Sequence, residues 1–131
     1  MTPYDNVSVQ RTLPPAARTA TANGSTVDRA AGGLRFQDAL ILIDTGVVTD
    51  GTHTFAVQES ADGTNWSAAA DADLQGTEPA VTSSNDETLY KIGYTGGARY
   101  LRVSVTVSGA TTGGLYSATI ALSNSRRASV N

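Results

Sequence analysis

The residue types that most often carry out catalysis are few in this chain and form no group. His53 is the single histidine, and it lies close to Asp50 in a stretch with the composition of a turn. A histidine that acts as a general base needs a nucleophile and an orienting group within hydrogen-bond reach. Serine and threonine, Ser60 among them, are spread along the whole sequence and mark no such partner. We therefore expect a histidine in a hairpin loop, no catalytic residue and no enzymatic activity.

Five acidic residues in the middle of the chain raise the question of a cation site or of a pair of catalytic carboxylates. Calcium takes several oxygen ligands from a turn whose geometry a glycine fixes, and a glycosidase places two carboxylates across a cleft. Asp71 and Asp73 have alternating spacing, but the rest of a calcium loop does not follow, and no aromatic platform accompanies the acids. We expect solvated loop charges, with no metal and no cofactor. The residues concerned are Asp71, Asp73, Glu78, Asp86 and Glu87.

Aromatic side chains offer a third kind of chemistry, which is stacking on a sugar ring. Trp66 is the one tryptophan, and with Tyr94 it could form a platform for a glycan. A large aromatic ring is more simply explained by the apolar area that it buries in a core. We expect Trp66 in the core, and a glycan platform of Trp66 and Tyr94 is the alternative.

Arginine and tyrosine residues near the two ends of the chain are candidates for contacts with a partner. Terminal segments outside a folded domain usually fray. They can also act as arms that reach an anionic neighbour or that add a strand to a partner's sheet edge. Both roles remain open from the sequence. The residues that the second role would use are Tyr4, Arg11, Arg18, Arg126 and Arg127.

The composition limits the protein classes to which the chain can belong. Its 131 residues suit one domain with a single core, and the absence of cysteine excludes disulfides and thiolate metal sites. The net charge of −3 at pH 7 argues against a nucleic-acid partner, which normally meets a basic face. The longest apolar run, from Ala39 to Ile43, is far shorter than a membrane span. The first ten residues contain no basic or long apolar stretch, so we expect synthesis in the cytoplasm without an export signal.

The strands that must carry these residues are marked by alternation of apolar and polar side chains. Residues 52–60 alternate in this way, and ADGT at 61–64 follows as a turn, since glycine accepts the positive φ of a tight hairpin. Residues 100–107 and 115–122 alternate just as clearly, and we expect them to pair with each other as a hairpin. The run from Ala39 to Ile43 is apolar at every position, which is typical of a central strand covered on both faces. Asp50-Gly51 is expected to form a hairpin turn between this strand and the next.

The chain contains seven to nine short strand patterns, separated by glycine, aspartate and proline turns, and no convincing helix. This pattern predicts an all-β fold, a single antiparallel β-sandwich or jelly roll with extended termini. Residues 1–18 are expected to hold an N-terminal arm and a first strand, which ends at Pro14-Pro15 because proline cannot donate to a strand ladder. Residues 19–122 form the predicted sandwich, and residues 123–131 a polar C-terminal tail.

Two short segments resemble the discoidin-like, galactose-binding jelly rolls. The sequence ESADGTNW at 59–66 resembles the S-x-D-G-x-x-W hairpin of that family, and ARYLRV at 98–103 resembles its A-R-Y-x-R strand. In those domains both motifs are architectural, because the tryptophan packs in the core and the second arginine usually lies on the sheet. The resemblance implies the same roles for Trp66 and Arg102. As a function it implies a domain that binds carbohydrate or a host surface.

A second resemblance runs from about residue 50 to residue 122. Six segments together are similar to a family of small proteins from tailed bacteriophages, which are usually encoded among the virion structural genes. The segments are DGTHT at 50–54, QES at 58–60, ADLQG at 72–76, KIGY at 91–94, RYLRV at 99–103 and SGATTGG at 108–114.

The phage resemblance implies a place for the protein and a set of partners. It implies a virion component on the capsid surface that decorates or cements the head, with the major capsid protein as partner. For this role we expect a homo-oligomer, and the charge and the short apolar runs predict no nucleic acid and no membrane as partners. A carbohydrate- or host-surface-binding module on the same virion, in a head fibre, a spike or the tail, is the alternative function.

Overall fold

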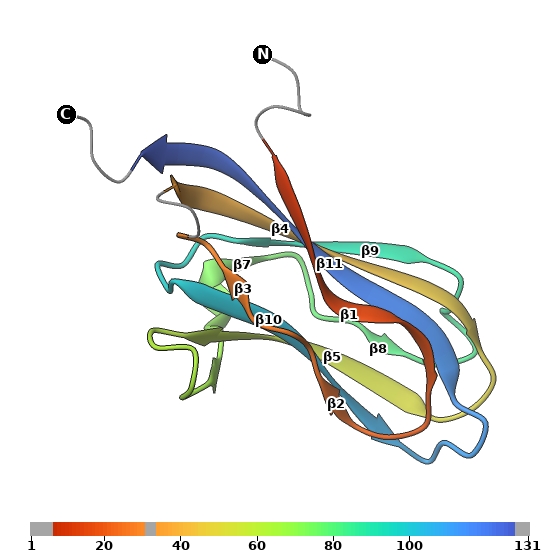
Figure 1. Cartoon of the computed structure of the whole chain (residues 1–131). Coiled ribbons are helices and arrows are strands. Elements are labelled where there is room, and N and C mark those ends of the chain that lie inside the picture. The colour runs from red at the N-terminus through yellow and green to blue at the C-terminus, as the bar shows by residue number, and fades with distance from the viewer. Residues whose placement is uncertain (1–6, 31–33, 128–131) are drawn as a thin grey trace.

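The computed structural model of the protein describes residues 7–30 and 34–127, which form two antiparallel sheets packed face to face (Figure 1). The predicted all-β sandwich is confirmed, and the sheets do not close into a barrel. The two faces that point toward each other hold the core, and each sheet has a second face that points outward.

The first sheet has five strands, with β4 in its middle. The run Ala39–Ile43 predicts this central position, which is confirmed. The inward residues Ile41 and Ile43 are fully buried, but Leu40 on the other side of the strand is 38% exposed. The expectation that both faces of this strand are covered is therefore wrong for the described chain. The strand order is β1 (Ser8–Arg18), β11 (Gly114–Arg127), β4 (Leu34–Val48), β9 (Leu89–Tyr94) and β7 (Leu74–Gln75).

The second sheet is built on β5 (Thr52–Ser60) and β10 (Tyr100–Ser108), which pair along their whole lengths. The predicted hairpin over residues 52–67 is confirmed, because β5 pairs with β6 (Ser67–Ala68). Among the described residues, no helix is long and apolar enough to cross a membrane. The remaining short strands are β2 (Ala22–Asn23) and β3 (Val27–Asp28) on β10, and β8 (Ala80–Val81) on β5; Asp71–Asp73 forms a 3-10 turn.

Two of the predicted hairpins are wrong. β11 pairs with β1 and β4, not with β10, and β4 and β5 belong to different sheets. The turn at Asp50-Gly51 and the loop before β11 therefore both cross from one sheet to the other. The Asp50 carboxylate holds these two crossings together, because it accepts hydrogen bonds from the main-chain N–H groups of Thr111, Thr112 and Gly113, the last at 2.6 Å. Alternation shows which side chains a strand buries, but it does not specify the neighbouring strand.

The two ends of the described chain depart from the predicted boundaries. β1 continues through Pro14-Pro15 to Arg18, because it is an edge strand whose register with β11 shifts on both sides of Leu13. β11 continues to Arg127 and pairs there with the start of β4. The first part of the predicted polar tail, residues 123–127, is thus a strand.

The core lies between the sheets and takes alternate residues from both. Its packing explains why the alternating stretches of the sequence fold as strands with one buried face. The largest fully buried apolar residues are Leu13, Val27, Ile41, Ile43, Val48, Phe55, Ile92, Tyr94, Leu101, Ile120 and Leu122.

Candidate functional site

His53 lies in the core and not in a loop, so its predicted position is wrong. Its side chain is fully buried, with Nδ1 2.7 Å from the Tyr116 hydroxyl and Nε2 3.1 Å from the Asp50 carbonyl oxygen. Burial raises the pKa of Tyr116 to about 12, so the hydroxyl stays protonated and donates to Nδ1. The Nε2–H then donates to the Asp50 carbonyl. Both ring nitrogens are occupied by partners that hold the fold together, and the arrangement is a structural one.

Two of the five acidic residues of the middle segment also serve the fold. Glu78 accepts a hydrogen bond from the Val57 N–H at 2.6 Å, and Asp86 accepts one from the Val48 N–H at 2.7 Å. Each of these carboxylates ties a loop to a strand. Within residues 7–30 and 34–127, no three His, Cys, Asp or Glu side chains come together in a way that could hold a metal ion.

The structure does not place Trp66 and Tyr94 on one exposed platform. Tyr94 is only 1% exposed, and its hydroxyl donates to Glu59 at 2.7 Å and accepts the Ala98 N–H at 3.1 Å. Burial, together with Glu59, raises the pKa of Tyr94 to about 12. Trp66 is half-buried, outside the core, and the Arg102 guanidinium lies 4.3 Å from its ring centre. The expectation of a core tryptophan is therefore wrong, and the tyrosine occupies the core instead.

The arginines expected at a partner interface are spread over β1 and β11. Arg11 is exposed on β1, opposite Thr119. Arg18 donates to the Pro14 carbonyl at 2.7 Å and to the Tyr116 carbonyl at 3.1 Å, so it is engaged within its own sheet. Arg126 and Arg127 belong to β11, where they pair in register with Arg35 and Leu34. Tyr4 lies outside the described residues.

Exposed apolar side chains lie on the outer face of the first sheet, among polar and charged ones. The described residues contain five large apolar side chains that are exposed, and all five belong to strands of this sheet. None of the described residues in strands of the second sheet has such an exposed apolar side chain. We call this outer surface of the first sheet the apolar face. Its residues are Val9, Leu40, Val47, Leu89 and Leu115, which are exposed by 65, 38, 51, 63 and 50%.

Strand register makes part of the apolar face continuous. Val9 on β1 lies opposite Ala121 on β11, and Ala121 lies opposite Leu40 on β4. Residues directly opposite each other on neighbouring strands point to the same side of a sheet. The three side chains therefore form one row across three strands. Leu42, half-buried, follows in the next row between Thr119 and Lys91.

Two hollows flank Leu115 at the far end of the apolar face. One has a volume of about 400 Å³ and lies between Pro15, Asp44 and Leu115. The other, of about 260 Å³, lies between Ala17, Val47 and Leu115. Both open beside a half-exposed leucine, so each has room for a side chain from a partner.

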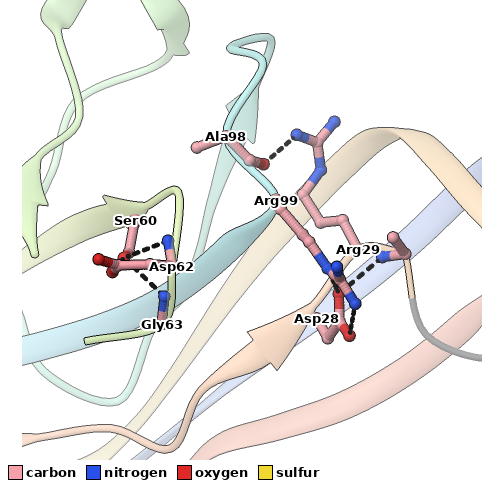
Figure 2. A network of polar contacts seen from close by, with 8 residues as sticks. Asp28, Arg29, Ser60, Asp62, Gly63, Ala98 and Arg99 are labelled. Carbon is pink, nitrogen blue, oxygen red and sulfur yellow. Dashed lines mark hydrogen bonds and ion pairs between the residues drawn. The ribbon is translucent and has the colours of Figure 1, made fainter. Parts of the chain in front are cut away.

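Arg29 forms a second feature, at the end of the sandwich where β9 stops. Its main-chain N–H donates to Arg99 and its carbonyl accepts from Phe36, so it joins the two sheets. Its guanidinium donates to the carbonyls of Ala98 at 2.6 Å and Gln37 at 2.8 Å. Figure 2 shows Arg29 beside Ala98 and beside the ion pair of Arg99 with Asp28, in which Arg99 Nε lies 2.9 Å from the carboxylate.

Sequence reasoning did not identify the apolar face or Arg29 as sites. The sequence does contain a signal for the apolar face, because the run Ala39–Ile43 places Leu40 and Leu42 on the side of β4 opposite the core. Arg29 follows a two-residue strand and precedes two alanines, and nothing in that context distinguishes it from a solvated surface residue.

No protein-family model matches this chain, and no curated protein is significantly similar to it.

Proposed function

We propose that this protein is a structural component of a bacteriophage virion that binds the outer surface of the head and stabilises junctions between capsid subunits. The observation that carries the proposal is the apolar face. Residues 39–43 of β4 are apolar on both sides, but on the outer side Leu40 is exposed and Leu42 is only half-buried by the described chain. The phage resemblance of residues 50–122 supplies the setting, and the major capsid protein is the proposed partner.

The mixture of residues on the apolar face suits a partner that is separately folded. Lys91 lies opposite Leu42 on β9, and Asp44 follows Leu42 in the next row of the sheet. Interfaces between separately folded proteins combine apolar residues with a polar rim in this way. Such an interface covers roughly 800 Å² on each partner, and burial of apolar area contributes about 25 cal/mol per Å².

The two hollows beside Leu115 would receive the anchoring side chains of the partner. Binding energy usually concentrates in a few side chains that fill pockets near the middle of a contact. In this proposal the capsid surface provides apolar anchors, and Leu115 and Val47 form the walls that they pack against.

The proposal includes a homo-oligomer. A protein that stabilises junctions in a symmetric shell follows the symmetry of those junctions, and most soluble assemblies are closed, symmetric homo-oligomers. Light scattering of the purified chain at micromolar concentration tests this part, and a monomer at all concentrations would contradict it.

The decoration proposal is tested by co-sedimentation with shells assembled from the major capsid protein. We expect wild-type protein to bind at a fixed ratio, and the variant Leu40→Gln/Leu115→Gln to lose affinity by about tenfold or more, because apolar contact area is removed. Thr106→Gln is the matched control, since Thr106 is exposed on β10 of the second sheet. Absence of binding by wild type, or equal binding by all three proteins, would contradict the proposal.

The alternative, a carbohydrate- or host-surface-binding module on the virion, depends on Trp66 alone because Tyr94 is buried. Binding of the wild-type protein to a glycan array, lost in Trp66→Ala and accompanied by no binding to shells, would replace the decoration proposal.

A further inference from the structure

A pocket lined by three arginines opens at the end of the sandwich where β9 stops. Its volume is about 440 Å³, and we call it the arginine pocket. It lies at the end of the molecule where β4 begins, away from Leu115 and its hollows. Its lining consists of Arg29, Ala30, Arg35, Phe36, Gln37, Gly96, Gly97, Ala98 and Arg99.

Arg29 is a buried cation whose partners are almost all neutral. Its side chain is 7% exposed, it donates to three main-chain carbonyls, and its guanidinium lies 5.2 Å from the ring centre of Tyr94. Its Nε is buried and has no hydrogen-bond partner among the described residues. The Asp38 carboxylate acts on this charge electrostatically, but it makes no hydrogen bond with the guanidinium among the described residues, and a buried charge without a directly bonded carboxylate is costly. An anion in the pocket would reduce that cost.

Arg35 and Arg99 supply accessible positive charge to the same pocket. Arg99 is held by Asp28, but half of its side chain remains exposed. Arg35 is exposed on β4 and makes no ion pair within the described chain. With Asp28 and Asp38 beside the three arginines, the pocket keeps a small excess of positive charge on a protein whose net charge is −3.

The glycine loop beside the arginines adds main-chain donors. The N–H groups of Gly96 and Gly97 donate to no acceptor among the described residues. A Cβ at position 96 would lie 2.5 Å from the Tyr94 hydroxyl, so glycine is required there for the close approach of the loop. Main-chain N–H groups next to arginine favour carboxylates and similar anions.

We propose that the arginine pocket binds an acidic peptide segment of a partner protein through its carboxylates. Phe36 and Ala98 give the pocket an apolar wall, which suits the methylene groups of a glutamate side chain. The volume is in the range of pockets that hold small ligands. A nucleic acid would need an extended basic surface, whereas the protein as a whole carries a net charge of −3. The proposal does not depend on the capsid proposal, because it concerns a different part of the molecule.

The experiment is a titration of the full-length ¹⁵N-labelled protein with a hexaglutamate peptide at 150 mM salt, followed by NMR. We expect saturable shifts at the amides of Ala30, Arg35, Gly96 and Gly97. Arg35→Gln should weaken binding about fivefold, because it removes a charge-assisted contact without touching the fold. Arg11→Gln makes the same change of charge on β1 and should change affinity less than about twofold.

Four outcomes would overturn the proposal. One is the absence of saturable shifts in the pocket, and another is an equal loss of affinity in Arg35→Gln and Arg11→Gln. A third is equal binding of a hexalysine peptide, which would exclude charge recognition. The fourth is inorganic phosphate binding at the same amides as tightly as the peptide, which would identify a site for free anions and not for a partner protein.

Discussion

Large side chains on the outer face of the second sheet are covered by other parts of the chain, whereas those on the outer face of the first sheet are exposed. On the second sheet, the rings of Trp66 and Tyr100 each lie beside a guanidinium, at 4.3 Å from Arg102 and 5.0 Å from Arg99. The loop that contains Gly63 approaches the Tyr100 ring as well. On the first sheet, the residues of the apolar face have no such cover from the described chain. The described chain thus covers the rings on one outer surface and leaves large apolar side chains exposed on the other.

The apolar face takes its residues from four strands of the first sheet. Single exposed apolar residues are common on protein surfaces, but contiguous apolar patches usually mark interaction sites. The row of Val9, Ala121 and Leu40 crosses three strands that are far apart in the sequence.

The largest expected effect is the difference in stability cost between a substitution on the inner side of β4 and one on its outer side. Ile41→Ala should lower the free energy of unfolding by about 2–5 kcal/mol, because it opens a cavity in the core. Leu40→Ala, one residue away and facing outward, should cost about 1 kcal/mol or less. Urea denaturation of both variants measures the difference. Equal costs would mean that the outer side of β4 is packed as tightly as the inner side.

A smaller effect is expected from the hydrogen-bonded pair of His53 and Tyr116 inside the sandwich. His53→Leu leaves the Tyr116 hydroxyl and the Asp50 carbonyl without their partner, and this should cost about 1–3 kcal/mol. In the double variant His53→Leu/Tyr116→Phe the cost should be less than additive, because the orphaned hydroxyl is gone. Strict additivity in thermal or urea unfolding would show that the two side chains are not coupled.

A still smaller effect is expected from the contact of Trp66 with Arg102 on the outer face of the second sheet. A double-mutant cycle with Trp66→Ala and Arg102→Gln should give a coupling free energy of about 0.5–1 kcal/mol, the range for partly exposed cation–π pairs. A coupling of zero would mean that Arg102 lies over the ring without stabilising it, and the contrast between the two outer faces would then be reduced.

The smallest effect concerns the pH dependence of the turn after β5. The Asp62 carboxylate accepts the N–H groups of Asn65 and Thr64 at 2.8 Å and the Ser60 hydroxyl at 2.9 Å, and these bonds hold its pKa well below the ordinary value. Because the folded-state pKa is depressed, the stabilisation is present above about pH 4, the pKa of an unfolded aspartate. It is lost as pH falls through the folded-state value. Asp62→Asn should show a shallower loss of stability between pH 4 and pH 2, and an unchanged slope would contradict this.

Local sequence patterns were sufficient to predict the strands, but not their arrangement. Alternation in residues 52–60 and 100–107 correctly identified β5 and β10, because one face of each strand must be apolar. The same pattern in residues 115–122 wrongly suggested a hairpin with β10. The choice between neighbouring and crossing strands depends on contacts such as the Asp50 carboxylate with the Thr111 and Thr112 amides, which are distant in sequence.

The candidate sites were harder to predict for a related reason. Trp66 follows a glycine turn and was expected in the core, but the short strand β6 that follows it lies at the margin of the second sheet, and the side chain is only half-buried. Leu40 was recognised as apolar on a two-sided strand, yet only the three-dimensional structure shows that one side is uncovered. Arg29 bonds to the loop at Gly96, after the end of β9. That loop is distant in sequence, so no local pattern indicates the contact.

The most direct test of the proposed role of the apolar face is a cryo-microscopy reconstruction of capsid shells decorated with this protein. We expect ordered, symmetric density in which the first sheet faces the shell, with Leu40 and Leu115 in contact with the capsid protein. Density that places the second sheet against the shell, with the apolar face open to solvent, would contradict it.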